Sequence, residues 1–199
     1  MIDELIEEKV ASTEYPVIDL IKNRWSPRAF SGNTVEEEKI MSLLEAARWA
    51  PSCFNEQPWN FILFKKENQE EFNKIIDVLS PRNQLWAKNA PLIMLSVAKI
   101  NFEHNRKLNR HASHDVGSAV TNLTIQATSM GLYVHQMAGF DSEKAKQLFK
   151  IPEGYEPVSA IAIGYFGSPF DLPEEFKKAE LAHRSRIPIS DFAFKGKWE

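Results

Sequence analysis

The chain has 199 residues, a formal net charge of −3, and 43% hydrophobic and 26% charged residues. This composition is typical of a folded globular protein and excludes disordered, collagen-like and low-complexity chains. The small negative charge creates no general positive field for nucleic acid or anionic lipid, so an anion site must be built locally. We therefore expect neither a nucleic-acid partner nor a membrane partner.

Cysteine usage and the N-terminal residues favour a cytoplasmic location. Cys53 is the single cysteine, so no internal disulfide can form, which suits a reducing compartment. The N-terminus, MIDELIEEKV, is acidic and lacks the basic and apolar regions of a secretory signal. The longest apolar stretches, such as residues 91–98 and 158–166, are much shorter than the ~20 residues of a membrane-spanning helix. No repeat or linker divides the chain, so we expect one domain over residues 1–199.

Helical and strand patterns alternate along the first half of the chain. Thr34 and Glu37 form a capping-box pair, and the helical spacing that follows predicts a helix ending before Pro51. Residues 60–65 predict a strand, residues 72–79 a helix, and residues 92–98 a buried strand.

The second half continues the alternation and then loses it. Residues 115–130 predict a long helix, with Gly131 as the residue that follows its end. A strand at 133–137, a helix at 142–149 and a strand at 157–165 are expected next. From Ser168 onward the pattern is irregular, yet the segment carries large apolar side chains, among them those of Phe170, Phe192, Phe194 and Trp198. We expect residues 168–199 to form an arm that packs on another surface, such as a second subunit.

Two segments carry paired arginines. Arg24 and Arg28 flank Ser26 in RWSPRAF, and Pro27 keeps this stretch out of a regular helix. Arg184 and Arg186 lie two residues apart near the other end of the chain, so an extended backbone would project both to one side. Such side chains suit a phosphate or a polarised carbonyl. On local composition alone, a basic loop that makes surface ion pairs is the favoured explanation of the first segment, and a solvated charge pair is the alternative for the second.

Two further segments suit a planar ligand. Residues 50–59, APSCFNEQPW, place small polar and amide side chains between two prolines, although an ordinary helix-to-strand connection would use the same residues. Gly139 follows a predicted strand in QMAGFD and permits close backbone approach, which alone is a weak signal. The four arginines from the two ends of the chain could converge on one phosphate-bearing ligand whose planar part meets the amide-rich loop.

Two other chemistries are not favoured. The histidines at 104, 111 and 114, with Glu103 and Asp115 nearby, lack the HExxH or cysteine spacing of a zinc site. Cys53 has no neighbouring histidine to activate a thiol nucleophile. We therefore predict neither a metal site nor a catalytic residue among these side chains.

Four ordered motifs together resemble the FMN-dependent nitroreductase family. The first is Arg-x-Ser-x-Arg/Lys-x-Phe, which reads here as Arg24, Ser26, Arg28 and Phe30. The second is Ala-Pro-Ser-x-x-Asn-x-Gln-Pro-Trp, present at residues 50–59. A long helix with Asp115, Gly117 and the sequence Met-Gly-Leu at 130–132 is similar to the family's central dimer helix. The Arg-Ser-Arg-Ile-Pro motif at 184–188 and the terminal Trp198 match the family's closing segment.

The resemblance implies an α+β fold with a central, mostly antiparallel sheet flanked by helices. It also implies an intertwined homodimer whose C-terminal arms embrace the partner and whose two FMN sites lie at the subunit interface. By the same resemblance, Arg24, Arg184 and Arg186 would hold the FMN phosphate, and Ser26 and Arg28 would contact the ribityl chain and the N1/O2 side of the ring. The remaining implied contacts come from Trp25, Pro51, Ser52, Cys53, Asn55, Gln136, Ala138 and Gly139, with Ser52, Cys53 and Asn55 supplied by the other subunit.

Two positions depart from the family pattern. Cys53 stands where many members have Ser, and Ala138 stands where many have Glu. Contacts made by the backbone would survive both changes. The shape of the substrate pocket depends on the side chains and would differ from that of those members.

The implied activity is NAD(P)H-dependent reduction of nitroaromatics, quinones or related small acceptors. Hydride would pass from nicotinamide C4 to flavin N5 and then to the acceptor, in a ping-pong scheme on one face of the ring. NADH or NADPH would bind transiently, because no GxGxxG fingerprint follows a strand. The alternatives are a flavin storage or sensing protein without turnover, and another flavin reaction of the family such as enone reduction or dehalogenation.

Overall fold

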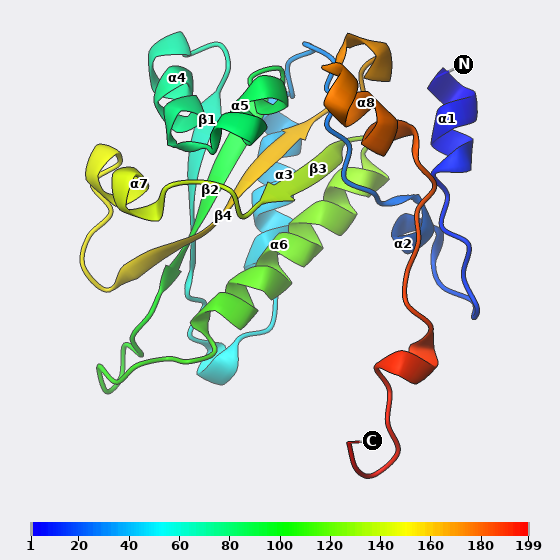
Figure 1. The fold of residues 1–199 in the computed structure, drawn as a ribbon. Coiled ribbons are helices and arrows are strands. Elements are labelled where there is room, and N and C mark those ends of the chain that lie inside the picture. The colour runs from blue at the N-terminus through cyan, green and yellow to red at the C-terminus, as the bar shows by residue number, and fades with distance from the viewer. Residues whose placement is uncertain (1, 199) are drawn as a thin grey trace.

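The computed structural model describes residues 2–198, and its centre is a four-stranded sheet (Figure 1). The strands are β1 (Trp59–Lys65), β2 (Leu92–Lys99), β3 (Tyr133–Met137) and β4 (Tyr155–Gly164), in the order β1-β2-β4-β3. All three neighbouring pairs are antiparallel. The expected α+β class and its antiparallel sheet are therefore confirmed, and β3 forms one edge of the sheet.

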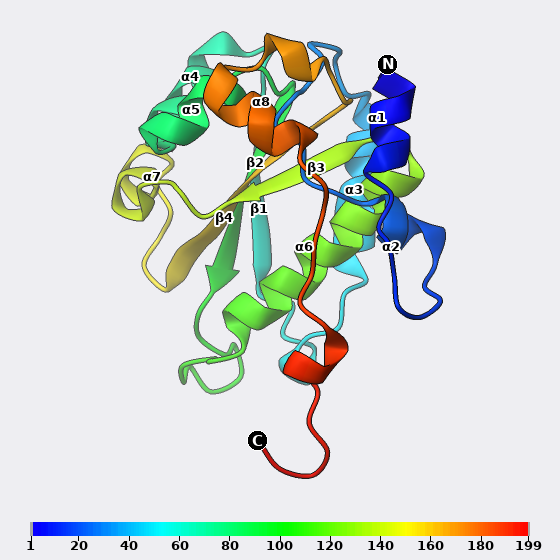
Figure 2. The same ribbon diagram turned by 45° about the vertical axis from the view of Figure 1, so that its right-hand side comes forward.

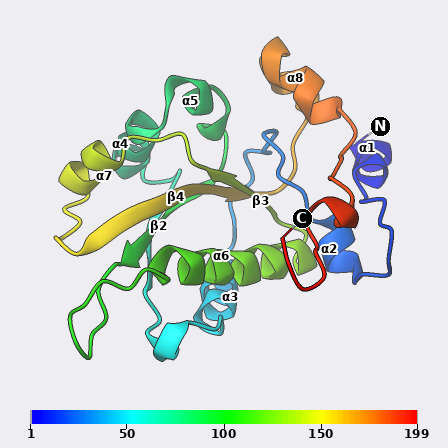
Figure 3. The same ribbon diagram turned by 60° about the horizontal axis from the view of Figure 1, so that its bottom comes forward.

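Helices cover both faces of the sheet (Figure 3). On one face lie α3 (Glu37–Arg48) and the long α6 (Ala112–Ser129). On the other lie α4 (Gln69–Val78), α5 (Pro81–Ala87) and α7 (Ser142–Leu148). Three further helices, α1 (Ile2–Glu8), α2 (Asp19–Asn23) and α8 (Glu174–Leu181), lie on the right-hand side of Figure 1.

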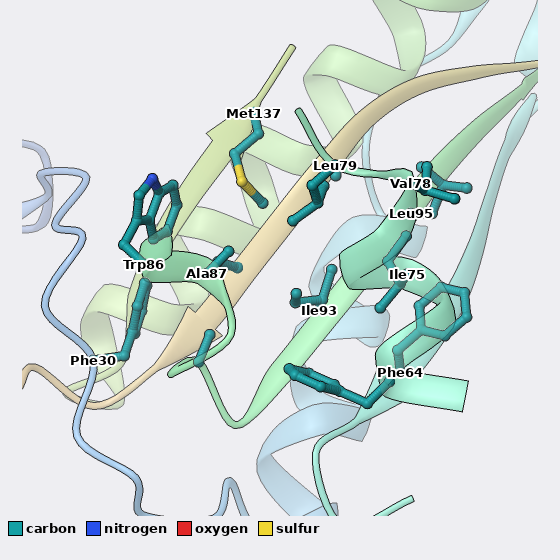
Figure 4. Packing of buried hydrophobic residues seen from close by; sticks show 14 of the residues in the cluster. Phe30, Phe64, Ile75, Val78, Leu79, Trp86, Ala87, Ile93, Leu95 and Met137 are labelled. Carbon is teal, nitrogen blue, oxygen red and sulfur yellow. The ribbon is translucent and has the colours of Figure 1, made fainter. Parts of the chain in front are cut away.

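Alternation along β2 divides the core into two layers. Ile93 and Leu95 pack against α4 and α5, in the cluster drawn in Figure 4. Leu92 and Met94 pack against α3 and α6 on the opposite face. Because both faces are covered, seven of the eight residues of β2 are buried, as the apolar sequence of this strand predicts.

The eight elements expected from periodicity are present with small shifts at their ends. Gly131 has φ +72° directly after α6, so its predicted role at the helix end is also confirmed. The capping box is wrong, because α3 has Glu36 as its N-cap residue and no side-chain cap. The Glu36 carboxylate instead accepts a hydrogen bond from the Tyr165 hydroxyl at 2.6 Å.

The segment after Ser168 is less irregular than expected, since α8 forms within it and buries Phe176. The sequence patterns did not predict α8, and they did not predict the short helices α1, α2 and α5. Helices of five to eight residues are stabilised by tertiary packing rather than by their own propensity, so their sequence signal is weak.

Beyond α8 the chain leaves the body of the molecule as an extended tail (Figure 2). Phe192 and Trp198 in this tail are 57% and 86% exposed. The described residues expose 11794 Å² in total, against about 9,600 Å² expected for a monomeric protein of this mass.

Within residues 2–198, no helix combines the length and apolar character that crossing a bilayer requires.

Candidate functional site

The segment from Arg24 to Phe30, here called the arginine segment, runs without regular structure along the edge of the sheet. Phe30 forms an isolated antiparallel bridge with Phe166, just beyond β4. The Ala29 carbonyl accepts a hydrogen bond from the Gly167 N–H at 2.9 Å. These contacts fix the end of the arginine segment on the chain that follows β4.

The C-terminal arginine pair is held against the N-terminal region. The guanidinium of Arg184 donates hydrogen bonds to the carbonyl oxygens of Lys9, at 2.6 Å, and Lys22, at 2.7 Å. The Lys9 ammonium in turn donates to the carbonyl of Ala182. Residues 182–184 are therefore attached to the ends of α1 and α2, which places them next to Arg24.

The two arginine pairs line one pocket of about 220 Å³, here called the arginine pocket. The residues that border it include Arg24, Arg28, Arg184 and Arg186, together with Ser26. A neighbouring cavity of about 490 Å³, between residues 11–21 and the start of the tail, shares Arg24, Arg184 and Arg186. The structure thus brings together the arginines from the two ends of the sequence.

The charges in the arginine pocket are unbalanced. Burial and the nearby Arg186 lower the pKa of Arg24. Burial, Arg24 and Arg186 likewise lower the pKa of Arg184. The carboxylate bordering the pocket, Glu180, accepts hydrogen bonds from main-chain N–H groups of the arginine segment. This donor set, with excess positive charge and planar guanidinium groups, fits a dianion such as a phosphate monoester.

Trp25 borders the pocket, but its ring is largely internal. The ring is 7% exposed and lies edge-on to Phe166 and Tyr133, with centroids 5.2 and 5.9 Å away. The Lys9 ammonium lies 5.3 Å from its centroid. These contacts indicate that the Trp25 side chain supports the arginine segment from beneath.

The amide-rich loop is tied to α6 through one carboxylate. The Cys53 N–H donates to Oδ2 of Asp115 at 2.9 Å, and Asp115 is 4% exposed. Phe54 and Asn55 adopt left-handed backbone conformations, with φ of 54° and 55°. Asn tolerates this region, whereas a bulky Phe there is unusual and carries backbone strain. The Asp115 anchor was not found from sequence, where this residue was considered only as a metal ligand and as part of a motif.

The amide-rich loop does not meet the arginine pocket within one chain. Pro51 and Asn55 are exposed, and Ser52 and Cys53 are half-buried, but none of them lines that pocket. The loop lies at the first turn of α6, whereas α2 and the arginine segment lie near its last turn (Figure 1). An 18-residue helix is about 27 Å long, so one small ligand cannot contact both groups in the same chain.

The end of β3 presents a third group. Gln136 and Ala138 are exposed at this edge. The Gly139 carbonyl accepts hydrogen bonds from the Ser80 N–H at 2.9 Å and from the Asn83 amide at 3.0 Å. A Cβ at Gly139 would lie 2.8 Å from the side chains of both Ser80 and Asn83. Glycine is therefore needed at this position for close packing against residues of the same chain.

The histidines do not assemble a metal site in the described part of the chain, where no three His, Cys, Asp or Glu side chains gather. His114 lies 3.2 Å from the Asp115 carboxylate. His104 packs with Phe54 and Phe102 in an exposed aromatic group, with ring centroids 5.3 to 5.9 Å apart.

The described chain thus combines an antiparallel α+β fold with a cationic pocket at the sheet edge, whose arginine side chains suit a small anionic ligand. The model of the nitroreductase family matches residues 21–80 and 68–165, most of the chain. The chain belongs to the nitroreductase family, which confirms the resemblance of its motifs.

Individual relatives agree with this assignment. A protein of Methanothermobacter thermautotrophicus with the provisional name NADH dehydrogenase/NAD(P)H nitroreductase is 32% identical over 164 residues, covering 80% of this chain and 81% of the relative. The major NAD(P)H-flavin oxidoreductase of Aliivibrio fischeri is 22% identical over 88% of this chain and 99% of its own.

A solved structure extends the likeness to the tail. The crystal structure of an oxidoreductase containing FMN superposes with a TM-score of 0.90 and 32% identity, covering 96% of this chain and 97% of that one. The family model ends at residue 165, so Arg184 and Arg186 lie beyond it. The structural match spans nearly the whole chain.

Proposed function

We propose that this protein is an FMN-dependent NAD(P)H oxidoreductase that reduces nitroaromatics, quinones or related small electron acceptors. The observation that carries the proposal is the convergence of Arg24, Arg184 and Arg186, from opposite ends of the sequence, on one pocket. Their mutual repulsion is relieved when a dianion binds between them. The FMN content of the similar oxidoreductase structure supports a flavin phosphate as that dianion.

Each arginine has a distinct task in this proposal. Arg24, Arg184 and Arg186 hold the phosphate, with Arg184 already fixed by two carbonyl oxygens. Ser26 and Arg28 contact the ribityl chain and the N1/O2 side of the ring. When bound, FMN supplies a carrier that accepts and donates hydride at N5. Arg28 stabilises the negative charge that reduction places on the ring, so it favours the two-electron reaction.

The remaining contacts require a second copy of the chain. Ser52, Cys53 and Asn55 lie about one helix length from the arginine pocket, so we propose that they reach the cofactor of the partner subunit. Gln136, Ala138 and Gly139 line the ring within the same chain. The homodimer is supported by the large exposed area and by the exposed Phe192 and Trp198 of the tail. The tail then covers the partner.

This arrangement leaves the reductant and the acceptor a shared position on the ring, which produces ping-pong kinetics. No side chain is required as a general base in this scheme. A flavin storage or sensing protein would use the same phosphate residues without turnover. Enone reduction and dehalogenation are further reactions of the same flavin.

The visible spectrum of the purified protein, before and after anaerobic NADH or NADPH, tests the proposal. We expect a yellow protein whose visible flavin absorption band bleaches with a reductant and returns on addition of a nitroaromatic or quinone. A yellow protein that neither nicotinamide bleaches would favour storage or sensing. A colourless protein that fails to bind added FMN would refute the proposal.

A further inference from the structure

Glu180 is a buried carboxylate in an unfavourable place. It lies in the last turn of α8, where the helix dipole disfavours negative charge, and it is 1% exposed. Burial raises the pKa of Glu180, so its charged form needs strong local partners. No motif in the sequence marked this residue.

The partners of Glu180 are main-chain groups of the arginine segment. The Arg28 N–H donates to Oε1 and Oε2 at 2.9 and 3.0 Å, and the Ala29 N–H donates to Oε1 at 3.0 Å. One carboxylate therefore accepts from the N–H groups of two consecutive residues. It fixes the backbone at the point from which the Arg28 side chain leaves.

The side chain of Arg28 rests on the same face of α8. Its guanidinium carbon lies 5.8 Å from the ring centroid of Phe176, which is 2% exposed. Phe176 and Glu180 are four residues apart, so they lie one above the other on the helix. One helical face thus holds both the main chain and the side chain of Arg28.

We propose that Glu180 is a positioning residue that fixes Arg28 for its contact with the flavin ring. The inference rests on the proposed function and adds α8 to the parts of the site. The guanidinium is placed before the cofactor arrives, which reduces the ordering cost of binding. Lys9 and Arg28 are the cations that attract Glu180, and the Lys9 ammonium is itself anchored on Ala182.

The test compares Glu180→Gln with Glu174→Gln, an exposed carboxylate of the same helix whose ion pair within the described chain is with Lys177. FMN affinity of the apoprotein is measured by quenching of flavin fluorescence. We expect Glu180→Gln to weaken binding about tenfold, as the loss of charged acceptors for two N–H groups implies. Glu174→Gln should stay within about twofold of the unchanged protein.

A double-mutant cycle separates positioning from general stability. In an Arg28→Ala background, Glu180→Gln should cost less than about threefold in FMN affinity, because the side chain that it positions is gone. Equal losses in both backgrounds would overturn the proposal. So would an unchanged affinity in Glu180→Gln. If Glu180→Gln does not fold, Phe176→Leu replaces it in the same cycle with the same expectation.

The midpoint potential of bound FMN gives a second, independent readout. If Glu180 acts by placing Arg28, then Glu180→Gln lowers the midpoint in the same direction as Arg28→Ala. A direct field effect of the lost negative charge would raise it, and a purely structural role would leave it unchanged; either result overturns the proposal. Failure of the unchanged protein to bind FMN would instead refute the proposed function, so the two failures are distinguishable.

Discussion

Nδ1 of His135 lies 2.9 Å from the carbonyl oxygen of Pro27, so one imidazole joins edge strand β3 to the arginine segment. The ring of His135 also packs on Trp86, with centroids 4.6 Å apart. Burial lowers the pKa of His135 to about 4, and the nearby Arg28 adds to the effect. The neutral imidazole with its proton on Nδ1 is therefore the form that donates to Pro27.

The free energy of unfolding should decrease as the pH is lowered, because of this histidine. The folded pKa of about 4 lies below the ordinary value of about 6.5, so between these values the unfolded chain binds more protons. The contribution is fully present above pH ~6.5 and is lost as the pH falls through the window, to a total of roughly 2–4 kcal/mol. Urea unfolding at several pH values measures it.

The variant His135→Gln should show a weaker dependence of stability on pH. The control is His114→Gln, because the His114 side chain is 79% exposed. A dependence equally steep in both variants would assign the loss to other groups.

Phosphate binding should depend on Arg186 with little effect on folding. Its guanidinium donates only to the carbonyl of Ser185 among the hydrogen bonds of the described chain, so Arg186→Ala removes a charge without breaking a tertiary hydrogen bond. We expect FMN affinity to fall about ten- to a hundredfold, with turnover nearly unchanged once FMN is saturating. Riboflavin, which lacks the phosphate, is the control ligand, and an equal loss for both flavins would contradict the assignment. Arg184→Ala should show the same selectivity together with a lower melting temperature, because Arg184 also binds two main-chain carbonyls.

Arg28→Ala should act on the redox ring instead. The missing charge is felt mainly when the ring is reduced, so the flavin midpoint potential should fall and reduction by NAD(P)H should slow even at full FMN loading. Spectroelectrochemistry and stopped-flow reduction measure the two effects. An unchanged midpoint would show that Arg28 has been assigned to the wrong end of the flavin.

Cys53 should be dispensable for turnover. The contact that holds it is the main-chain N–H bonded to Asp115, which a serine retains. Cys53→Ser should therefore keep most of the activity under steady-state assay. A loss of more than a hundredfold, about 2.7 kcal/mol of transition-state stabilisation, would make the thiol essential.

The tail should be required for both assembly and cofactor retention. Light scattering at micromolar concentration should give twice the chain mass of 22.8 kDa. Truncation after Pro188 removes the exposed aromatic side chains and should weaken the dimer and FMN binding together. A monomer that retains FMN tightly would refute a site shared between subunits.

Sequence patterns predicted the elements whose stability comes from a repeated apolar face. The β2 strand and α6 were predicted because residues such as Leu92 and Val116 recur at the period of their element. The arginine segment was found because its ordered motif is specific. Glu180 and His135 were missed because their meaning lies in partners 152 and 108 residues away along the chain. A single acidic residue in a short helix carries no local sign of such a partner.

Burial and the nearby Arg24 lower the pKa of Arg184, and burial and Arg186 lower the pKa of Arg24, so the arginine pocket suits small dianions in general. Under the proposed function, inorganic phosphate and sulfate from purification buffers should then compete with FMN for the same guanidinium groups. Cofactor affinities measured in phosphate buffer would understate the true value in proportion to the anion concentration. The same competition would let the orthophosphate level of a cell adjust how much of this protein carries its flavin.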